Sequence, residues 1–175
     1  PLVPLPAALY RDGVRVITVH TVRAADATEG AKVGNYLASL LALRQAKAAG
    51  AHEALITDAL GRIIEGTTSN VFVVRDGQVL TPPEEQGLLP GITRAHLLEV
   101  AAEEKIPVRL SPIGEDDRAA ASEAFLSSSL REVLPIVAID DQVVGSGAPG
   151  PITRRLHAAF RRRVGVGAEP MPWEG

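Results

Sequence analysis

The chain has 175 residues and a formal net charge of −3, and hydrophobic residues make up 46% of it. This composition excludes a disordered chain, and the acidic balance argues against a nucleic-acid-binding surface. The sequence has no cysteine, which excludes disulfides, thiolate metal sites and a cysteine nucleophile. No apolar run reaches the ~20 residues that a membrane helix needs.

The sequence predicts an α/β fold with a mixed sheet, because strand and helix patterns interleave along the chain. It opens with a proline-rich stretch without Met or a signal peptide, which we interpret as a linker at residues 1–13. Strands are predicted at 14–22, 54–57, 62–65, 71–74, 78–81, 108–113, 125–128 and 133–139, and helices at 35–49, 92–105, 116–122 and 152–164.

Three local patterns make sharper predictions. Residues 14–22 include apolar side chains on both of the faces that alternate along a strand, which predicts a strand buried on two sides. Asp76-Gly77 and Asp140-Asp141 predict hairpin turns. In the helix at 92–105, we expect Ala95, Leu98 and Ala102 to form the buried stripe.

Two apparent motifs are weak. Gly145, Gly147 and Gly150 match a dinucleotide-binding pattern, but they follow a hairpin arm rather than the first strand of a βαβ unit, so a plain loop is favoured. The four histidines are each more than thirty residues apart and show no metal-ligand spacing, so we expect no metal site.

Two charged residues are candidates for chemistry. Lys32 lies in a loop of small residues between Gly30 and Gly34, where an apolar site would lower its pKa towards that of a nucleophilic amine. Glu65 ends an apolar strand, and a carboxylate buried there needs a cationic or N–H partner. The ordinary alternatives are a surface lysine and a solvated strand-end glutamate.

Two segments are candidates for binding an anion. Residues 88–93 place backbone N–H groups and the Thr93 hydroxyl at a helix N-terminus, which suits a phosphate. Ser127-Ser128-Ser129 offers further hydroxyl and N–H groups at a strand end. Helix capping and a polar loop are the ordinary alternatives.

Together these segments resemble the C-terminal domain of class IV (fold type IV) pyridoxal-phosphate (PLP) enzymes. That family comprises branched-chain aminotransferases, D-amino-acid aminotransferases and 4-amino-4-deoxychorismate lyases. The resemblance runs from about Val14 to Val164, and it predicts a mixed sheet forming a partial barrel flanked by helices. The matching motifs stand in order at 32–37, 65–70, 89–94 and 125–135.

The resemblance implies a role for each matching residue. Lys32 would form the Schiff base with PLP and carry the proton in catalysis, Glu65 would bind the pyridine nitrogen, and Tyr36 would reach the cofactor's 3′ oxygen. The remaining cofactor contacts would come from Leu89 on the ring and, at the phosphate, from Ile92, Thr93, Ser128 and Ser129.

The resemblance leaves the subgroup open. The spacing from Lys32 to Asn35 is like that of the D-amino-acid aminotransferases and lyases, whereas Tyr36-Leu37 and residues 89–93 are like the branched-chain group. Ser127-Ser128-Ser129-Leu130 departs from the Ser-Gly-Thr that is common in the branched-chain enzymes. Our leading hypothesis is an aminotransferase for branched-chain or related amino acids with 2-oxoglutarate. The alternatives are the lyase, the D-amino-acid enzyme and a non-catalytic domain that keeps the fold.

The resemblance also predicts how the chain is organised. We expect a linker at 1–13, a PLP-binding domain at 14–165 and a tail at 166–175, with the family's N-terminal domain absent and this fragment by itself inactive. The implied partners are an amino acid, a 2-oxo acid and a second copy of the enzyme in a cytoplasmic homodimer, with no nucleic acid and no membrane.

Overall fold

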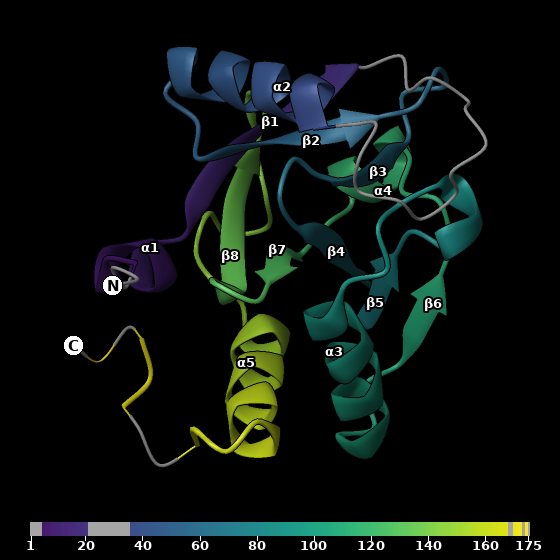
Figure 1. Ribbon diagram of the computed structural model, residues 1–175. Coiled ribbons are helices and arrows are strands. Elements are labelled where there is room, and N and C mark those ends of the chain that lie inside the picture. The colour runs from purple at the N-terminus through teal and green to yellow at the C-terminus, as the bar shows by residue number, and fades with distance from the viewer. Residues whose placement is uncertain (1–4, 21–35, 168–169, 173, 175) are drawn as a thin grey trace.

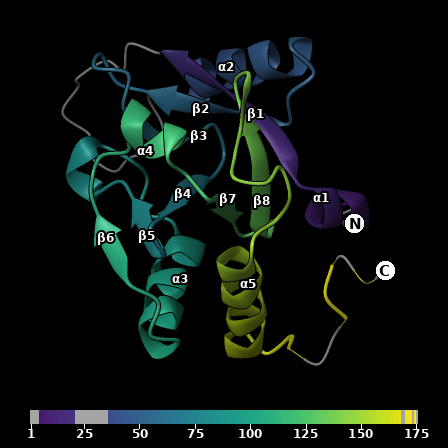
Figure 2. The same cartoon turned by 180° about the vertical axis from the view of Figure 1, so that it is seen from behind.

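The computed structural model describes residues 5–20, 36–167, 170–172 and 174, except for the side chain of Tyr36. Figures 1 and 2 show a curled sheet with one helix above it and two helices side by side below it. The helices are α1 (Ala7–Asp12), α2 (Tyr36–Ala48), α3 (Ile92–Glu103), α4 (Glu115–Ala119) and α5 (Pro151–Arg163), with a 3₁₀ turn at Glu84–Gln86. The strands are β1 (Val14–His20), β2 (Glu53–Thr57), β3 (Ile63–Gly66), β4 (Asn70–Arg75), β5 (Gln78–Thr81), β6 (Val108–Leu110), β7 (Glu123–Ser128), β8 (Glu132–Ile139) and β9 (Gln142–Val143).

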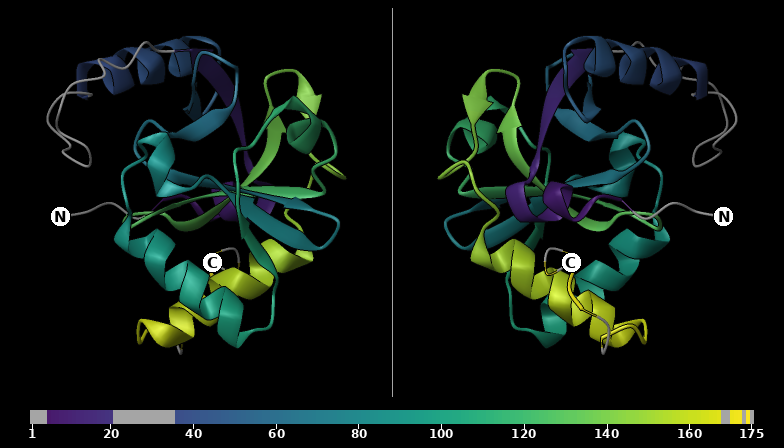
Figure 3. Two further views of the ribbon diagram at one scale, coloured as in Figure 1. Left: turned by 90° about the vertical axis from the view of Figure 1, so that its right-hand side faces the viewer. Right: turned by 90° about the vertical axis from the view of Figure 1, so that its left-hand side faces the viewer.

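The sheet closes on itself. Its strand order in the described part is β3-β2-β1-β8-β7-β4-β5-β6, with β9 paired to β8. Beyond β6, Ile113 forms a bridge with Ile63 of β3, so the two ends of the strand order meet. The expected α/β fold with a mixed sheet in a partial barrel is therefore confirmed, and Figure 3 shows the curl from the side.

Alternation along the strands builds the core. In β4, Val71 and Val73 point into the cluster enclosed by the sheet, whereas Phe72 and Val74 belong to a second cluster between the sheet and helices α3 and α5. Phe72 stacks on Phe125 of β7 with ring centroids 4.7 Å apart. Successive side chains of a strand face opposite sides, so each central strand serves both cores.

Strand β1 serves two cores in the same way. Val16 lies in the cluster enclosed by the sheet, and Val19 packs against α2 in a third cluster. The predicted burial on two sides is confirmed for these residues, although Arg15 and His20 are exposed.

The predicted strands and helices from residue 36 onward are present, with shifted ends. The strand predicted at 108–113 stops at Leu110, shortly before Pro112, which has no N–H for a ladder. The hairpin predicted at Asp76-Gly77 is confirmed by the pairing of Arg75 with Gln78. Residues 21 and 22 of the strand predicted at 14–22 lie outside the described residues.

The prediction for the buried face of α3 was wrong for Ala95 and Ala102, which are exposed. The predicted Leu98 is partly buried against the second cluster, and the helix also buries Leu97, Val100 and Ala101 against the sheet and α5. Thr93 and Arg94 at its N-terminus are buried as well. The buried face of the helix therefore includes these two positions and lies away from the two alanines. The spacing of apolar residues does not reveal this face, because Thr93 and Arg94 are polar.

Residues 7–12, within the segment interpreted as a linker, form helix α1. Its Tyr10 is buried, and the Tyr10 hydroxyl donates to the backbone carbonyl of Arg131 at 3.1 Å. Burial, reinforced by the negative charge of Glu132, raises the pKa of Tyr10 to about 12. The hydroxyl therefore stays protonated and able to donate.

A cluster of charges holds α5 to the sheet. His157 Nε2 donates to Glu132 Oε2 at 2.6 Å, and Arg161 Nη1 contacts the same oxygen at 3.1 Å. Burial alone would raise the pKa of Glu132, but the hydrogen bond from His157 and the charge of Arg161 outweigh it and lower that pKa below its ordinary value.

We expect Glu132→Gln to lower the free energy of unfolding by about 2 kcal/mol at neutral pH, because it removes a charged acceptor from two buried donors. The folded-state pKa of Glu132 lies below its unfolded value of 4.5, so its contribution is present above that value and is lost as pH falls through the folded-state pKa. Urea titrations should show a difference from wild type that shrinks below about pH 4. A difference that stays constant into the acid range would contradict this role.

Candidate functional site

The structure describes some of the predicted site residues and not others. Lys32 lies outside the described residues. Tyr36 is the first residue of α2, and its side chain is also outside the described part. Glu65, Leu89, Ile92, Thr93, Ser128 and Ser129 are described.

Glu65 is joined directly to the segment that contains Leu89. It lies in β3, opposite Ile56 of β2, and is half-buried. Its Oε2 accepts a hydrogen bond of 2.9 Å from the backbone N–H of Leu89. The strand-end carboxylate therefore has the N–H partner that its position required, and that partner comes from the motif at 89–94.

Asn70 holds the same peptide segment from its other side. Asn70 Nδ2 donates to the carbonyl of Leu89 at 2.9 Å, and the side chain is almost fully buried. A Cβ on Gly91 would lie 2.1 Å from Asn70 Oδ1, so only glycine allows this close approach. Asn70 belongs to the motif at 65–70, but the sequence did not single it out as a functional residue.

Helix α3 begins directly after this segment. Gly91 is its N-cap and supplies no side-chain cap. The N–H groups of Ile92 and Thr93 lie in the first turn of the helix, where they have no acceptor within the helix. Thr93 is buried, whereas the Ile92 side chain is exposed. Its twelve residues also direct the positive end of the helix dipole to this point.

The serines reach the same region through the sheet. Ser127 of β7 pairs with Asn70 of β4, and Ser128 ends the strand, with Ser129 exposed just beyond it. Ser127 Oγ is buried and has no hydrogen-bond partner among the described residues. The sheet thus brings the motifs at 65–70, 89–94 and 127–129 together.

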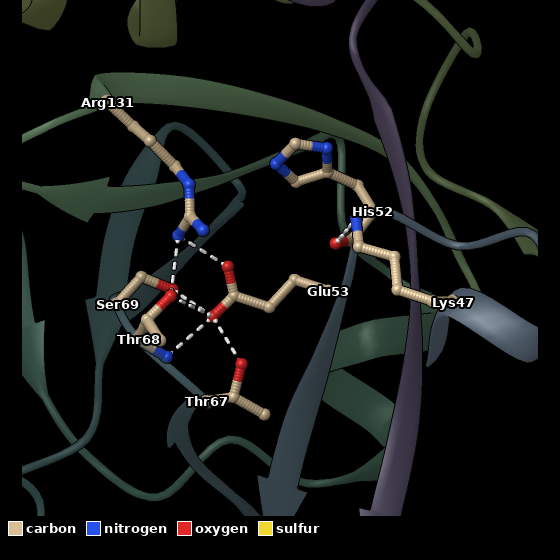
Figure 4. A network of polar contacts seen from close by, with 7 residues as sticks. All are labelled: Lys47, His52, Glu53, Thr67, Thr68, Ser69 and Arg131. Atoms are coloured by element: carbon tan, nitrogen blue, oxygen red, sulfur yellow. Dashed lines mark hydrogen bonds and ion pairs between the residues drawn. The ribbon is translucent and has the colours of Figure 1, made fainter. Parts of the chain in front are cut away.

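Two charged residues of this region were missed. Glu53, fully buried at the start of β2, pairs with the partly buried Arg131, which follows the serines within the motif at 125–135 (Figure 4). Burial lowers the pKa of the neighbouring His52, helped by the positive charges of Lys47 and Arg131, so this ring adds no positive charge at neutral pH. The sequence signal was a glutamate within the apolar run 51–57, since a buried carboxylate requires a partner.

Arg94 was missed as well. It is buried in the first turn of α3 and donates to the Pro82 carbonyl at 2.9 Å and to Glu84 at 3.1 Å. These contacts tie the beginning of the 82–91 loop to the helix that ends it. Arg94 therefore supports the loop that carries Leu89.

The described residues place a hydrogen-bond acceptor at one end of this region and a set of hydrogen-bond donors at the other. Glu65 provides a carboxylate acceptor, and α3 with the serines provides N–H and hydroxyl donors. Such a pair suits a ligand with a protonated nitrogen at one end and an anionic group at the other. Among the described residues, the donor set and the unpartnered Ser127 hydroxyl fit the PLP that the resemblance implied.

Two other kinds of site are missing from the described part of the chain. No cluster of three or more His, Cys, Asp or Glu side chains able to hold a metal ion occurs there. No helix in it has the length and apolar character needed to cross a membrane.

Comparison with known proteins gives consistent matches. A sequence profile of the amino-transferase class IV family matches residues 2–139. A putative branched-chain-amino-acid aminotransferase of Methanocaldococcus jannaschii is 39% identical over 161 residues, which cover 91% of this chain and 56% of that protein. The chain therefore spans about half the length of this curated relative.

Solved structures agree in fold. The branched-chain amino acid aminotransferase of Escherichia coli matches with a TM-score of 0.86 and 33% identity, over 97% of this chain and 57% of that one. The T.th. branched-chain amino acid aminotransferase, solved with N-(5′-phosphopyridoxyl)-L-glutamate, matches with a TM-score of 0.83 and 34% identity, over 95% and 56%.

We expect Gly91→Ala to destabilise the full-length protein by about 1–3 kcal/mol, because the new methyl group displaces Asn70 and breaks its bond to Leu89. Gly114→Ala is the matched control: Gly114 is also a helix N-cap, and a Cβ there would meet its nearest neighbour only at 3.9 Å. Denaturant unfolding compares the two. Equal, small losses for both variants would show that Asn70 does not fix the segment.

Proposed function

Because the chain belongs to the class IV aminotransferase family, we propose that the full-length protein is a PLP-dependent aminotransferase. It would transfer an amino group between an amino acid, in the first instance a branched-chain one, and a 2-oxo acid. The branched-chain preference rests on the relatives named above, two of which are solved aminotransferases for these amino acids.

One observation carries the proposal. The backbone of Leu89 accepts a hydrogen bond from Asn70 at its carbonyl and donates one to Glu65 from its N–H, so the motifs at 65–70 and 89–94 meet in a single place. The pairing of Ser127 with Asn70 adds the serines. The segments to which we assign complementary roles towards one cofactor are thus adjacent, although Asn70 and Ser127 lie more than fifty positions apart in the sequence.

Glu65 would serve the ring end of the site. When bound, PLP supplies an electron sink for the carbanion that forms at the amino acid's Cα. A carboxylate at the ring nitrogen keeps that nitrogen protonated, which strengthens the sink. The bond from Leu89 N–H keeps Glu65 in place for this role.

Helix α3 and the serines would serve the phosphate end. The N–H groups of Ile92 and Thr93, the Thr93 hydroxyl and the groups of Ser128 and Ser129 are donors suited to a phosphate. The helix dipole favours the same negative charge. Leu89 would lie against the ring between the two ends.

Lys32 and Tyr36 complete the proposal from outside the described side chains. Lys32 would bond the cofactor and then, with its amine freed, carry the proton to and from Cα. Tyr36 would reach the 3′ oxygen. Tyr36 is the first residue of α2, and this helix lies above β1 and β2 (Figure 1).

The remaining parts of the proposal concern the whole protein. The chain spans 56% of the Methanocaldococcus relative, and the rest of the protein would supply the groups that bind the substrate carboxylate. We further propose a homodimer acting in the cytoplasm. The lyase alternative has no support from the relatives named above, which are aminotransferases.

Lys32→Ala in the full-length protein should abolish turnover and also the retention of PLP after borohydride reduction, because no amine remains to bond it. Undiminished turnover, or cofactor still trapped by borohydride, would overturn the assignment of Lys32. Absorbance of the dialysed, reduced protein measures the trapped cofactor.

Glu65→Ala should lower kcat by about 100-fold or more while PLP stays bound, because the electron sink weakens and the phosphate contacts survive. Glu85→Ala is the control, since Glu85 is an exposed carboxylate of the 82–91 loop. Steady-state kinetics on both variants test the role. Wild-type rates in Glu65→Ala would contradict it.

A substrate panel separates the possible reactions. We expect the full-length enzyme to form glutamate from 2-oxoglutarate with leucine, isoleucine or valine as the donor. Release of pyruvate from aminodeoxychorismate without an amino acceptor would identify the lyase instead. Turnover of D-alanine with no turnover of branched-chain L-amino acids would identify the D-amino-acid enzyme.

A further inference from the structure

Three segments of the chain meet at one buried carboxylate. Glu53 Oε1 accepts hydrogen bonds from Thr67 Oγ1 at 3.1 Å, from Thr68 N at 2.8 Å and from Ser69 Oγ at 2.9 Å. Its other oxygen accepts from Arg131 Nη1 at 2.6 Å. Figure 4 shows the carboxylate between the 67–69 turn and the arginine.

The 67–69 turn has its conformation set by Glu53. Its three residues follow one another in sequence, and all donate to the same carboxylate oxygen. A Cβ on Gly66 would lie 2.2 Å from Ser69 Oγ and 2.6 Å from Glu53 Oε1, so the turn packs closely against the carboxylate. This turn joins Glu65 of β3 to Asn70 of β4.

Arg131 extends the connection to the serines. Its Nη1 donates to Thr68 Oγ1 at 2.9 Å as well as to Glu53. Its backbone N–H donates to the carbonyl of Ser128 at 3.3 Å, and its own carbonyl accepts from Tyr10. The arginine is therefore fixed at both its backbone and its side chain, and the side chain is only 18% exposed.

A buried ion pair is weak evidence for stability, because desolvation offsets the attraction between the charges. Its directional bonds do, however, fix the relative position of the segments that it joins. Here those segments are the turn between Glu65 and Asn70 and the turn that carries Ser128 and Ser129. By the proposed function, on which this inference rests, they contact opposite ends of one cofactor.

We propose that Glu53 and Arg131 are positioning residues that fix the separation between the ring-nitrogen contact at Glu65 and the phosphate contacts at Ser128 and Ser129. In this role both residues act through the turns that they join. A ligand that spans both ends gains affinity only when the separation is correct, whereas a ligand that occupies one end does not depend on it.

The test compares three probes on the full-length apoprotein: PLP, pyridoxal and inorganic phosphate. In Arg131→Met, the affinity for PLP should fall about tenfold or more, while the affinities for pyridoxal and for phosphate change less than about twofold. Absorbance and fluorescence titrations give the dissociation constants of PLP and pyridoxal, and competition with PLP gives that of phosphate. Arg131→Lys should restore part of the affinity for PLP, since it keeps the charge.

A double variant separates positioning from folding. Glu53→Gln with Arg131→Met removes both charges, so its thermal midpoint should recover towards wild type relative to Arg131→Met alone. Its affinity for PLP should remain low, because the bonds between the turns are still missing. Affinity that recovers together with stability would overturn the proposal, as would an equal loss of affinity for all three probes.

Arg62→Met is the matched control. Arg62 forms a 2.7 Å ion pair with Asp58 in the connection between β2 and β3, so this pair joins residues of one connection rather than two separate turns. The affinity of the Arg62→Met variant for PLP should equal that of the wild-type protein. A wild-type protein that fails to bind PLP would refute the proposed function itself, whereas normal binding of PLP by Arg131→Met in a PLP-binding protein would refute only this inference.

Discussion

The two hydrogen bonds on the backbone of Leu89 are the interaction on which the rest of the site depends. Glu65 binds its N–H and Asn70 its carbonyl, so the backbone of one residue is held on both sides by a motif some twenty residues earlier. Helix α3 starts three residues after Leu89, and its position follows. Pairing of Asn70 with Ser127 then relates the serines to the same point.

Buried charge occurs in two places, beside this point and against α5, where Glu123 and Arg161 are buried. The cluster enclosed by the sheet is almost entirely aliphatic, whereas Glu53, Arg131 and Arg94 lie at the ends of strands and at the start of α3. Each bonds to a segment other than its own, so the loops are held by directional bonds while the apolar core determines the curl of the sheet. Rigid strands that present polar loops are a common way to build a binding site.

The fold was largely predictable from local patterns, and the site only in part. Turn signals and period-two alternation located the strands, because both act within a few residues. The prediction of the buried face of α3 was wrong for Ala95 and Ala102, because Arg94 is buried through partners on the preceding loop. Glu53 and Arg131 were missed for the same reason: they are 78 positions apart, and only the folded sheet brings them together.

A crystal structure of the full-length protein with PLP tests the central claim most directly, namely that these motifs form one cofactor site. The account predicts a Glu65 carboxylate oxygen within about 3.2 Å of the pyridine nitrogen and the phosphate at the N-terminus of α3. It also predicts that the hydrogen bonds from Leu89 N–H to Glu65 and from Asn70 to the Leu89 carbonyl are kept. PLP bound with its phosphate away from α3, or with its ring nitrogen out of reach of Glu65, would contradict it.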